Sequence, residues 1–183
     1  MPAKVPAELV AMTADEKQAL IFATAIPGAC WAVGCAAFLY DRSGTWSWYK
    51  SLKRPSWAIP AKCLLPAHFL LDVVSIAPLA YATTLVWKKG GGLDNADTKT
   101  AMVSYAALYG LSLLTLPAFY SKDLKSATCG VAMSTAVGAV TAHLYYKILP
   151  RAGQLALPAL AYMAYMTLSL FRMSEMNDKP KKN

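Results

Sequence analysis

Five long apolar stretches alternate with short polar segments along the chain. They cover about residues 19–40, 63–87, 100–120, 127–146 and 154–173. Each stretch has roughly the 20 residues that an α-helix needs to cross the ~30 Å hydrocarbon core of a bilayer. A polar amino-terminal arm covers residues 1–18, and a polar tail covers residues 174–183. The pattern predicts an all-α fold, an integral membrane bundle of five transmembrane helices.

The composition agrees with a membrane protein. Hydrophobic residues make up 56% of the chain and charged residues 15%, whereas soluble domains have about 25% charged residues. The net charge of +8 is compatible with nucleic-acid binding, but the basic residues lie between apolar stretches and not along one solvated face. We therefore expect membrane lipids, and no nucleic acid, as partners. Lys and Arg are more frequent in the first loop and the tail than in the other polar segments, which favours a cytosolic-side position for both.

The most unusual polar segment is the stretch Trp48–Pro66, which joins the first apolar stretch to the second. It combines aromatic side chains, which prefer the head-group region of a membrane, with three prolines that restrict the backbone. These features predict a stiff, basic, non-helical cap up to about Cys63 over one mouth of the bundle. Its aromatic residues are Trp48, Tyr49 and Trp57, and its basic residues are Lys50, Lys53, Arg54 and Lys62.

The second apolar stretch contains two polar side chains, His68 and Asp72, four residues apart and therefore on one helix face. A carboxylate inside a membrane helix costs about 2.5–3.5 kcal/mol on insertion scales, so it should face the bundle interior and find a partner. Two interpretations remain open, a ligand or proton site and a hydrogen-bonded pair that locks helix packing. We expect no metal site, because only His143 could join the pair and it lies toward the far end of its own helix.

Small residues recur every four positions in the fourth stretch, at Gly130, Ser134, Gly138 and Ala142. Such a stripe predicts close packing against another helix. Tyrosines pair at helical spacing at positions 105 and 109 and at positions 162 and 165, a pattern more typical of a core than of a ligand site. We find no nucleophile elbow and no phosphate-binding glycine loop, so we do not expect an enzyme.

Several short motifs of the chain belong together: Trp48-Tyr49, Leu52, Pro55-Ser56-Trp57, Pro60, Leu85-Val86-Trp87-Lys88 and Leu157-Pro158-Ala159-Leu160-Ala161-Tyr162. With these motifs the chain resembles the TspO/MBR family of translocator and tryptophan-rich sensory proteins. The resemblance extends from about Trp46 to Asn177 and covers all five stretches. It implies a five-helix membrane bundle, often dimeric and commonly in the mitochondrial outer membrane. It also implies a pocket for porphyrins, sterols or similar apolar ligands that is closed by the first loop.

The chain also departs from the family pattern. His68 and Lys62 stand where members usually carry tryptophan, and Asp72 where they usually carry tyrosine. The aromatic pattern of the third helix is reduced to Ser112-Leu-Leu-Thr-Leu-Pro117, and Tyr162 replaces a tryptophan of the fifth helix. The scaffold is therefore kept while much of the aromatic pocket, which would stack on a porphyrin face, is altered.

Two functional hypotheses follow. The first is a membrane protein that binds a porphyrin or haem, a sterol or another lipid as monomer or homodimer, without a required cofactor. The alternative is an accessory structural subunit of a larger mitochondrial, respiratory-type complex in the inner membrane, which has lost ligand binding. For the first hypothesis, the candidate ligand-binding residues are Trp48, Trp57, Pro60, His68, Asp72, Pro117, Tyr162 and Tyr165.

Overall fold

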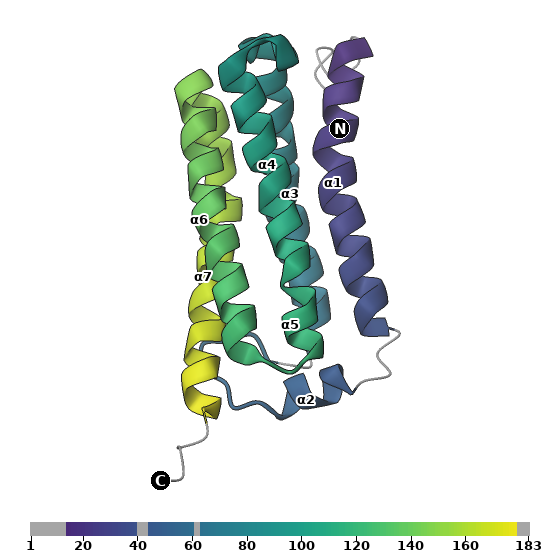
Figure 1. Ribbon diagram of the computed structural model, residues 1–183, viewed down its shortest axis with the longest axis vertical. Coiled ribbons are helices and arrows are strands. Elements are labelled where there is room, and N and C mark those ends of the chain that lie inside the picture. The colour runs from purple at the N-terminus through teal and green to yellow at the C-terminus, as the bar shows by residue number, and fades with distance from the viewer. Residues whose placement is uncertain (1–13, 40–43, 61–62, 179–183) are drawn as a thin grey trace, which may run out of the picture.

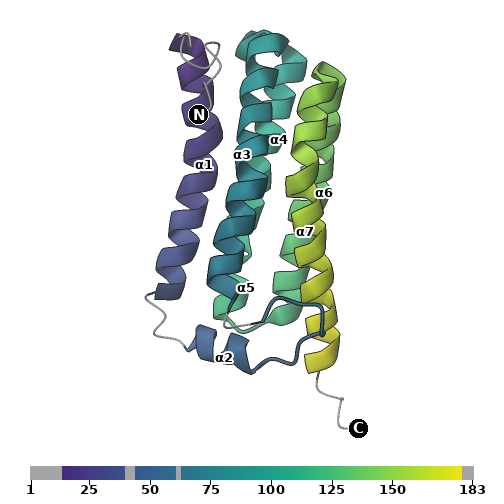
Figure 2. The same ribbon diagram turned by 180° about the vertical axis from the view of Figure 1, so that it is seen from behind.

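A computed structural model of the chain describes residues 14–39, 44–60 and 63–178, except for some side chains of the first long helix and those of residues 64–69, 72 and 73. The described residues form helices and turns, without strands. Five long helices run side by side, and a short helix crosses beneath one end of the bundle (Figures 1 and 2). The long helices are α1 (Ala14–Leu39), α3 (Leu64–Gly90), α4 (Ala96–Leu114), α6 (Leu124–Ile148) and α7 (Pro150–Asn177).

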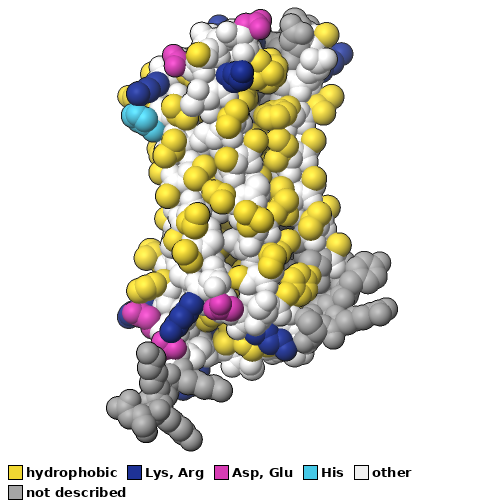
Figure 3. All heavy atoms as spheres, viewed as in Figure 1, with side chains coloured by type: hydrophobic (Ala, Val, Ile, Leu, Met, Phe, Trp, Pro, Cys, Tyr) yellow, Lys and Arg dark blue, Asp and Glu magenta, His cyan; other side chains and the backbone are white. Residues whose placement is uncertain are grey.

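Three helical segments in the described part of the chain are long and apolar enough to cross a membrane. They are Ala96–Tyr120, Leu124–Ile148 and Pro150–Asn177. Figure 3 shows the matching surface, with hydrophobic side chains over the middle of the bundle and charged side chains gathered at its two ends. The protein is therefore an integral membrane protein, as the hydrophobic pattern predicts.

Two short elements differ from the pattern predicted by the sequence. Residues Thr45–Ser51 of the first loop form the helix α2, so the expectation that this loop is non-helical up to Cys63 is wrong. The prolines that restrict the loop lie beyond Ser51, and Gly44 begins the helix with a positive φ of 72°, a conformation that glycine adopts readily. A 3-10 turn, η3 (Gly92–Asp94), follows α3.

The expected third helix is interrupted at Thr115, and the short helix α5 (Leu116–Tyr120) follows. Pro117 has no backbone N–H group and cannot continue the hydrogen-bond ladder. The Thr115 hydroxyl donates to the carbonyl oxygen of Ser112 at 2.6 Å, and its N–H donates to the same oxygen at 3.2 Å. The Thr115 side chain thus supplies one of the hydrogen bonds that the Ser112 carbonyl oxygen accepts at the break.

Polar side chains begin α4 and α6. The Asn95 side chain accepts the backbone N–H groups of Asp97 and Thr98, and Asp123 accepts those of Lys125 and Ser126. Hydrogen bonds from the Ser126 hydroxyl and N–H lower the pKa of Asp123. Because folding lowers the pKa of Asp123, its ionised carboxylate stabilises the folded protein at pH values above the unfolded pKa. This stabilisation is lost as the pH falls through the folded pKa.

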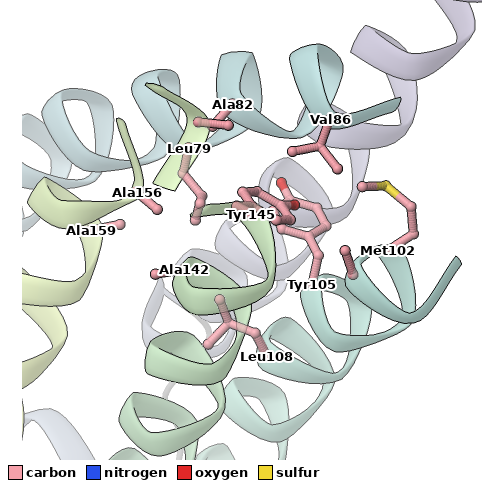
Figure 4. Close-up of a cluster of buried hydrophobic side chains, with 12 residues drawn as sticks. Leu79, Ala82, Val86, Met102, Tyr105, Leu108, Ala142, Tyr145, Ala156 and Ala159 are labelled. Atoms are coloured by element: carbon pink, nitrogen blue, oxygen red, sulfur yellow. The ribbon is translucent and has the colours of Figure 1, made fainter. Parts of the chain in front are cut away.

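The core of the bundle lies between α3, α4, α6 and α7 and combines small apolar residues with two fully buried tyrosines, Tyr105 and Tyr145 (Figure 4). The Tyr145 hydroxyl is 2.7 Å from the Thr83 hydroxyl, and the Tyr105 hydroxyl donates to the carbonyl oxygen of Ala23 in α1. Lipid tails are as apolar as leucine, so membrane helices associate through close packing and interhelical hydrogen bonds. These hydroxyl contacts therefore hold α1, α3, α4 and α6 together.

Candidate functional site

A cavity of about 250 Å³ lies midway along the bundle, between α1, α3, α4 and α7. The cavity is lined by Pro27, Cys30, Ser75, Ile76, Leu79, Leu108, Tyr109, Ser112, Ala159, Tyr162 and Met163.

Among the residues that the structure describes, the lining of the cavity contains no charged side chain. The Ser112 hydroxyl donates to the carbonyl oxygen of Leu108 at 2.9 Å, and the Ser75 hydroxyl likewise donates to Leu71 in its own helix. Both hydroxyl oxygens keep lone pairs that can accept a hydrogen bond. The site therefore offers apolar contacts and a few neutral acceptors, an arrangement that suits an uncharged ligand with one or two hydroxyl groups.

Tyr109 is held in place at the cavity wall. Its ring meets the Tyr105 ring edge to face, with centroids 5.1 Å apart. The Cys30 thiol lies 3.8 Å from the Tyr109 carbonyl oxygen, within the range of a weak sulfur hydrogen bond. These contacts join α1 to α4, so the wall is built from two helices that the chain brings together across 79 residues.

Of the predicted ligand-binding residues whose side chains the structure describes, one lines the cavity and the others lie outside its lining. Tyr162 lines the cavity, and Tyr165 lies about one helical turn further along α7. Trp57 is 50% exposed and packs edge to face on the Tyr165 ring at 5.8 Å. Trp48 belongs to α2, and Pro60 and Pro117 are exposed outside the cavity. His68 and Asp72 lie in α3, but their side chains are outside the described part of the structure.

The first loop is fastened to α7 at two places. The Ile59 N–H group donates to the Tyr165 hydroxyl at 3.0 Å. At the end of α7, the Asn177 side chain accepts the Lys53 N–H and donates to the Lys53 carbonyl oxygen, both at 2.9 Å. A side-chain amide that satisfies both backbone groups of one residue fixes that residue's position. The loop is therefore held across the end of the bundle, beside the helix that carries Tyr162.

Arg54 stiffens the same loop from within. Its guanidinium lies 4.3 Å from the centroid of the Tyr49 ring and donates to the Tyr49 carbonyl oxygen at 2.6 Å. Burial raises the pKa of Tyr49, and the adjacent positive charge of Arg54 offsets part of that rise. Tyr49 belongs to a small buried cluster with Leu124, Leu170 and Met173, which seats α2 against α6 and α7.

Removing the Tyr165 hydroxyl tests this attachment. In Tyr165→Phe the ring against Trp57 remains, but the Ile59 N–H loses its acceptor. We expect a loss of about 0.5–1.5 kcal/mol in the local closing free energy of the loop. Hydrogen–deuterium exchange should rise roughly threefold to tenfold at residues 55–60 and stay unchanged in α6. Unchanged exchange at residues 55–60 would show that this bond does not hold the loop.

The small-residue stripe of α6 is used for packing within the chain. Ser134, Gly138 and Ala142 are buried, and Gly130 is half-buried. A β-carbon at Gly130 would lie 2.5 Å from the Thr115 side chain, and one at Gly138 would lie 3.2 Å from the Met163 sulfur. The stripe therefore packs against the α4–α5 junction and α7, and it does not present a free surface to a partner chain.

Sequence reasoning did not assign most of the cavity wall. Small polar and aliphatic residues such as Ser75, Leu79 and Ala159 look like ordinary helix-packing positions, and only their spatial convergence makes them a site. Tyr109 had a signal, because it pairs with Tyr105 at helical spacing, but that pattern also fits a buried core. Pro27 and Cys30 come from the first apolar stretch and carry no motif.

Comparison with known proteins finds relatives of this chain. The model of the TspO/MBR family matches residues 23–175. A translocator protein of Bos taurus is 28% identical over 139 residues, which cover 75% of this chain and 79% of the relative. A translocator protein of Homo sapiens is 29% identical over 124 residues, which cover 66% of this chain and 69% of the relative. The matched region contains every described residue that lines the cavity.

Proposed function

Because the chain belongs to the TspO/MBR family, we propose that it is a membrane protein that binds a neutral apolar ligand of the sterol class. The ligand would occupy the cavity between α1, α3, α4 and α7. The observation that carries this proposal is the lining of that cavity, which is apolar and uncharged and has hydroxyl acceptors at Ser75 and Ser112.

The same lining argues against a porphyrin as the preferred ligand. Carboxylate-bearing porphyrins would bring negative charge into a site whose described lining residues include no Lys or Arg, and burial of an unpaired charge is costly. Of the described residues, two aromatic ones, Tyr109 and Tyr162, border the space, which limits stacking on a macrocycle. A sterol requires none of these interactions, because its rings are aliphatic and its single hydroxyl needs only one acceptor.

The size of the cavity also favours a ligand that enters it with only part of its length. Its volume of about 250 Å³ is slightly below the 300–1,000 Å³ typical of small-molecule sites. We propose that the hydroxyl end of the ligand occupies the cavity while its alkyl tail lies between the helices toward the lipid. The fastened first loop would restrict access from the water at its end of the bundle, so the ligand would enter from the membrane.

The proposal includes five membrane crossings. In addition to the three apolar segments described above, α1 and α3 have 26 and 27 residues, more than the roughly 20 needed for a crossing. Both line the cavity and run alongside the other helices (Figure 2). The family resemblance further leads us to propose the mitochondrial outer membrane as the location, which fractionation of cells would test.

Equilibrium binding to the purified protein in lipid nanodiscs tests the ligand class. We expect saturable micromolar binding of a fluorescent sterol, and binding of protoporphyrin at least about tenfold weaker, because its carboxylates find no cation among the described lining residues. Empty nanodiscs of the same lipid give the background for both ligands. Tighter binding of protoporphyrin, or sterol binding equal to that of empty nanodiscs, would contradict the proposal.

A further inference from the structure

A second cavity lies at the opposite end of the bundle from α2. It has a volume of about 410 Å³ and is formed where α3 ends, α4 begins and α6 ends. Its polar lining consists of Lys89, Gly90, Asn95, Asp97, Thr98 and Lys147. It shares no residue with the cavity described above, and the proposed sterol site makes no use of it.

Two lysines from different helices converge on this cavity. Lys89 belongs to the last turn of α3 and Lys147 to the last turn of α6. Neither forms an ion pair with another residue that the structure describes. Two polar groups of the lining already bond each other, because the buried Thr98 hydroxyl donates to the Gly90 carbonyl oxygen at 2.8 Å. The two ammonium groups therefore remain available to an anion.

The surface next to this cavity is apolar. Ser104 of α4 and Thr141 of α6 share a hydrogen bond of 2.8 Å that joins the two helices. Their sequence neighbours Val103 and Val140 are 61% and 53% exposed. Figure 3, which views the bundle from the α4 and α6 side, shows hydrophobic side chains below the charged end. A molecule held by the lysines would thus have an apolar path along this seam.

We infer that this cavity binds a glycerophospholipid, with the lipid phosphate between Lys89 and Lys147 and the acyl chains along the α4–α6 seam. Basic pockets between membrane helices are suited to lipid head groups. Asp97, the acidic residue of the lining, favours a head group that also carries an ammonium group, such as ethanolamine. A free phosphate ion would satisfy the lysines but would make no use of the seam or of Asp97.

The test is native mass spectrometry of the full chain released from detergent with added phosphatidylethanolamine. The double variant Lys89→Gln/Lys147→Gln should bind roughly tenfold less lipid, because each basic residue near a membrane surface contributes several-fold to anion binding. The control Lys99→Gln/Arg151→Gln removes the same charge at the same end from exposed residues outside the cavity and should bind like the wild type. All proteins should unfold at the same temperature without added lipid.

Two further measurements identify the head group and distinguish a lipid phosphate from a free phosphate ion. Asp97→Asn should reduce the preference for phosphatidylethanolamine over phosphatidylglycerol. Inorganic phosphate at the same concentration should not displace the lipid. Equal lipid binding by the lysine double variant and the control, or displacement of the lipid by inorganic phosphate alone, would overturn the inference.

Discussion

Ala159→Phe should weaken sterol binding by about 100-fold or more while the protein remains folded. Ala159 is a buried residue of α7 whose side chain borders the cavity. A phenylalanine ring there would fill much of a 250 Å³ space and would exclude the ring end of a ligand. A 100-fold loss corresponds to about 2.8 kcal/mol, which is within reach of a steric block in a packed site.

Ala161→Phe is the matched control for this variant. It introduces the same ring two residues away on the same helix, at an exposed position outside the cavity lining. Binding of the fluorescent sterol to both variants in nanodiscs, with thermal unfolding measured in parallel, separates a blocked site from a damaged fold. If Ala159→Phe unfolds early, Ser112→Leu narrows the same cavity from α4. Wild-type affinity in a folded Ala159→Phe or Ser112→Leu protein would mean that the ligand binds elsewhere.

Gly153→Ala should strongly destabilise the bundle. A β-carbon at position 153 would lie 2.5 Å from Cβ, 2.8 Å from Cα and 2.9 Å from the backbone nitrogen of Tyr146. The clash involves backbone atoms and so cannot be relieved by rotation of a side chain. We expect the overpacking to cost about 1–3 kcal/mol, which exceeds the gain of up to about 1 kcal/mol from the higher helix propensity of alanine.

Gly110→Ala is the control for this prediction, because a β-carbon at position 110 meets no atom within 4 Å. Both variants are measured by thermal unfolding in one detergent, and Gly110→Ala should unfold at or slightly above the wild-type temperature. If Gly153→Ala unfolds at the wild-type temperature as well, then α6 and α7 do not approach each other as closely at this junction as the structure shows.

The helical part of the fold was readable from the sequence because apolar stretches of membrane length are a strong and local signal. The short helix α2 was missed because the prolines of the loop dominated its interpretation, although they all lie beyond Ser51. The break at Thr115 had a visible cause in Pro117, but the Thr115 hydroxyl that bonds the Ser112 carbonyl oxygen there has no signal in the sequence. Such details depend on single contacts and not on periodicity.

The candidate site was less predictable, because its parts are distant in the sequence. Tyr162 was among the predicted ligand residues and does line the cavity. The loop residues Trp48 and Trp57 instead pack near or against α7, and the bond between Lys53 and Asn177 spans 124 residues. No local sequence pattern predicts a contact between residues so far apart in the chain. The cavity is lined by side chains from four helices, and a sequence does not display their convergence directly.

We expect a sterol-class ligand to occupy the cavity between α1, α3, α4 and α7, and photolabelling locates the bound sterol. A photoreactive sterol is crosslinked to the protein in nanodiscs, and the labelled peptides are identified by mass spectrometry. We expect adducts around Pro27–Cys30, Ser75–Leu79 and Ala159–Met163 that excess unlabelled sterol abolishes. Adducts confined to exposed lipid-facing residues such as Leu168 and Phe171, or insensitive to unlabelled sterol, would contradict the claim.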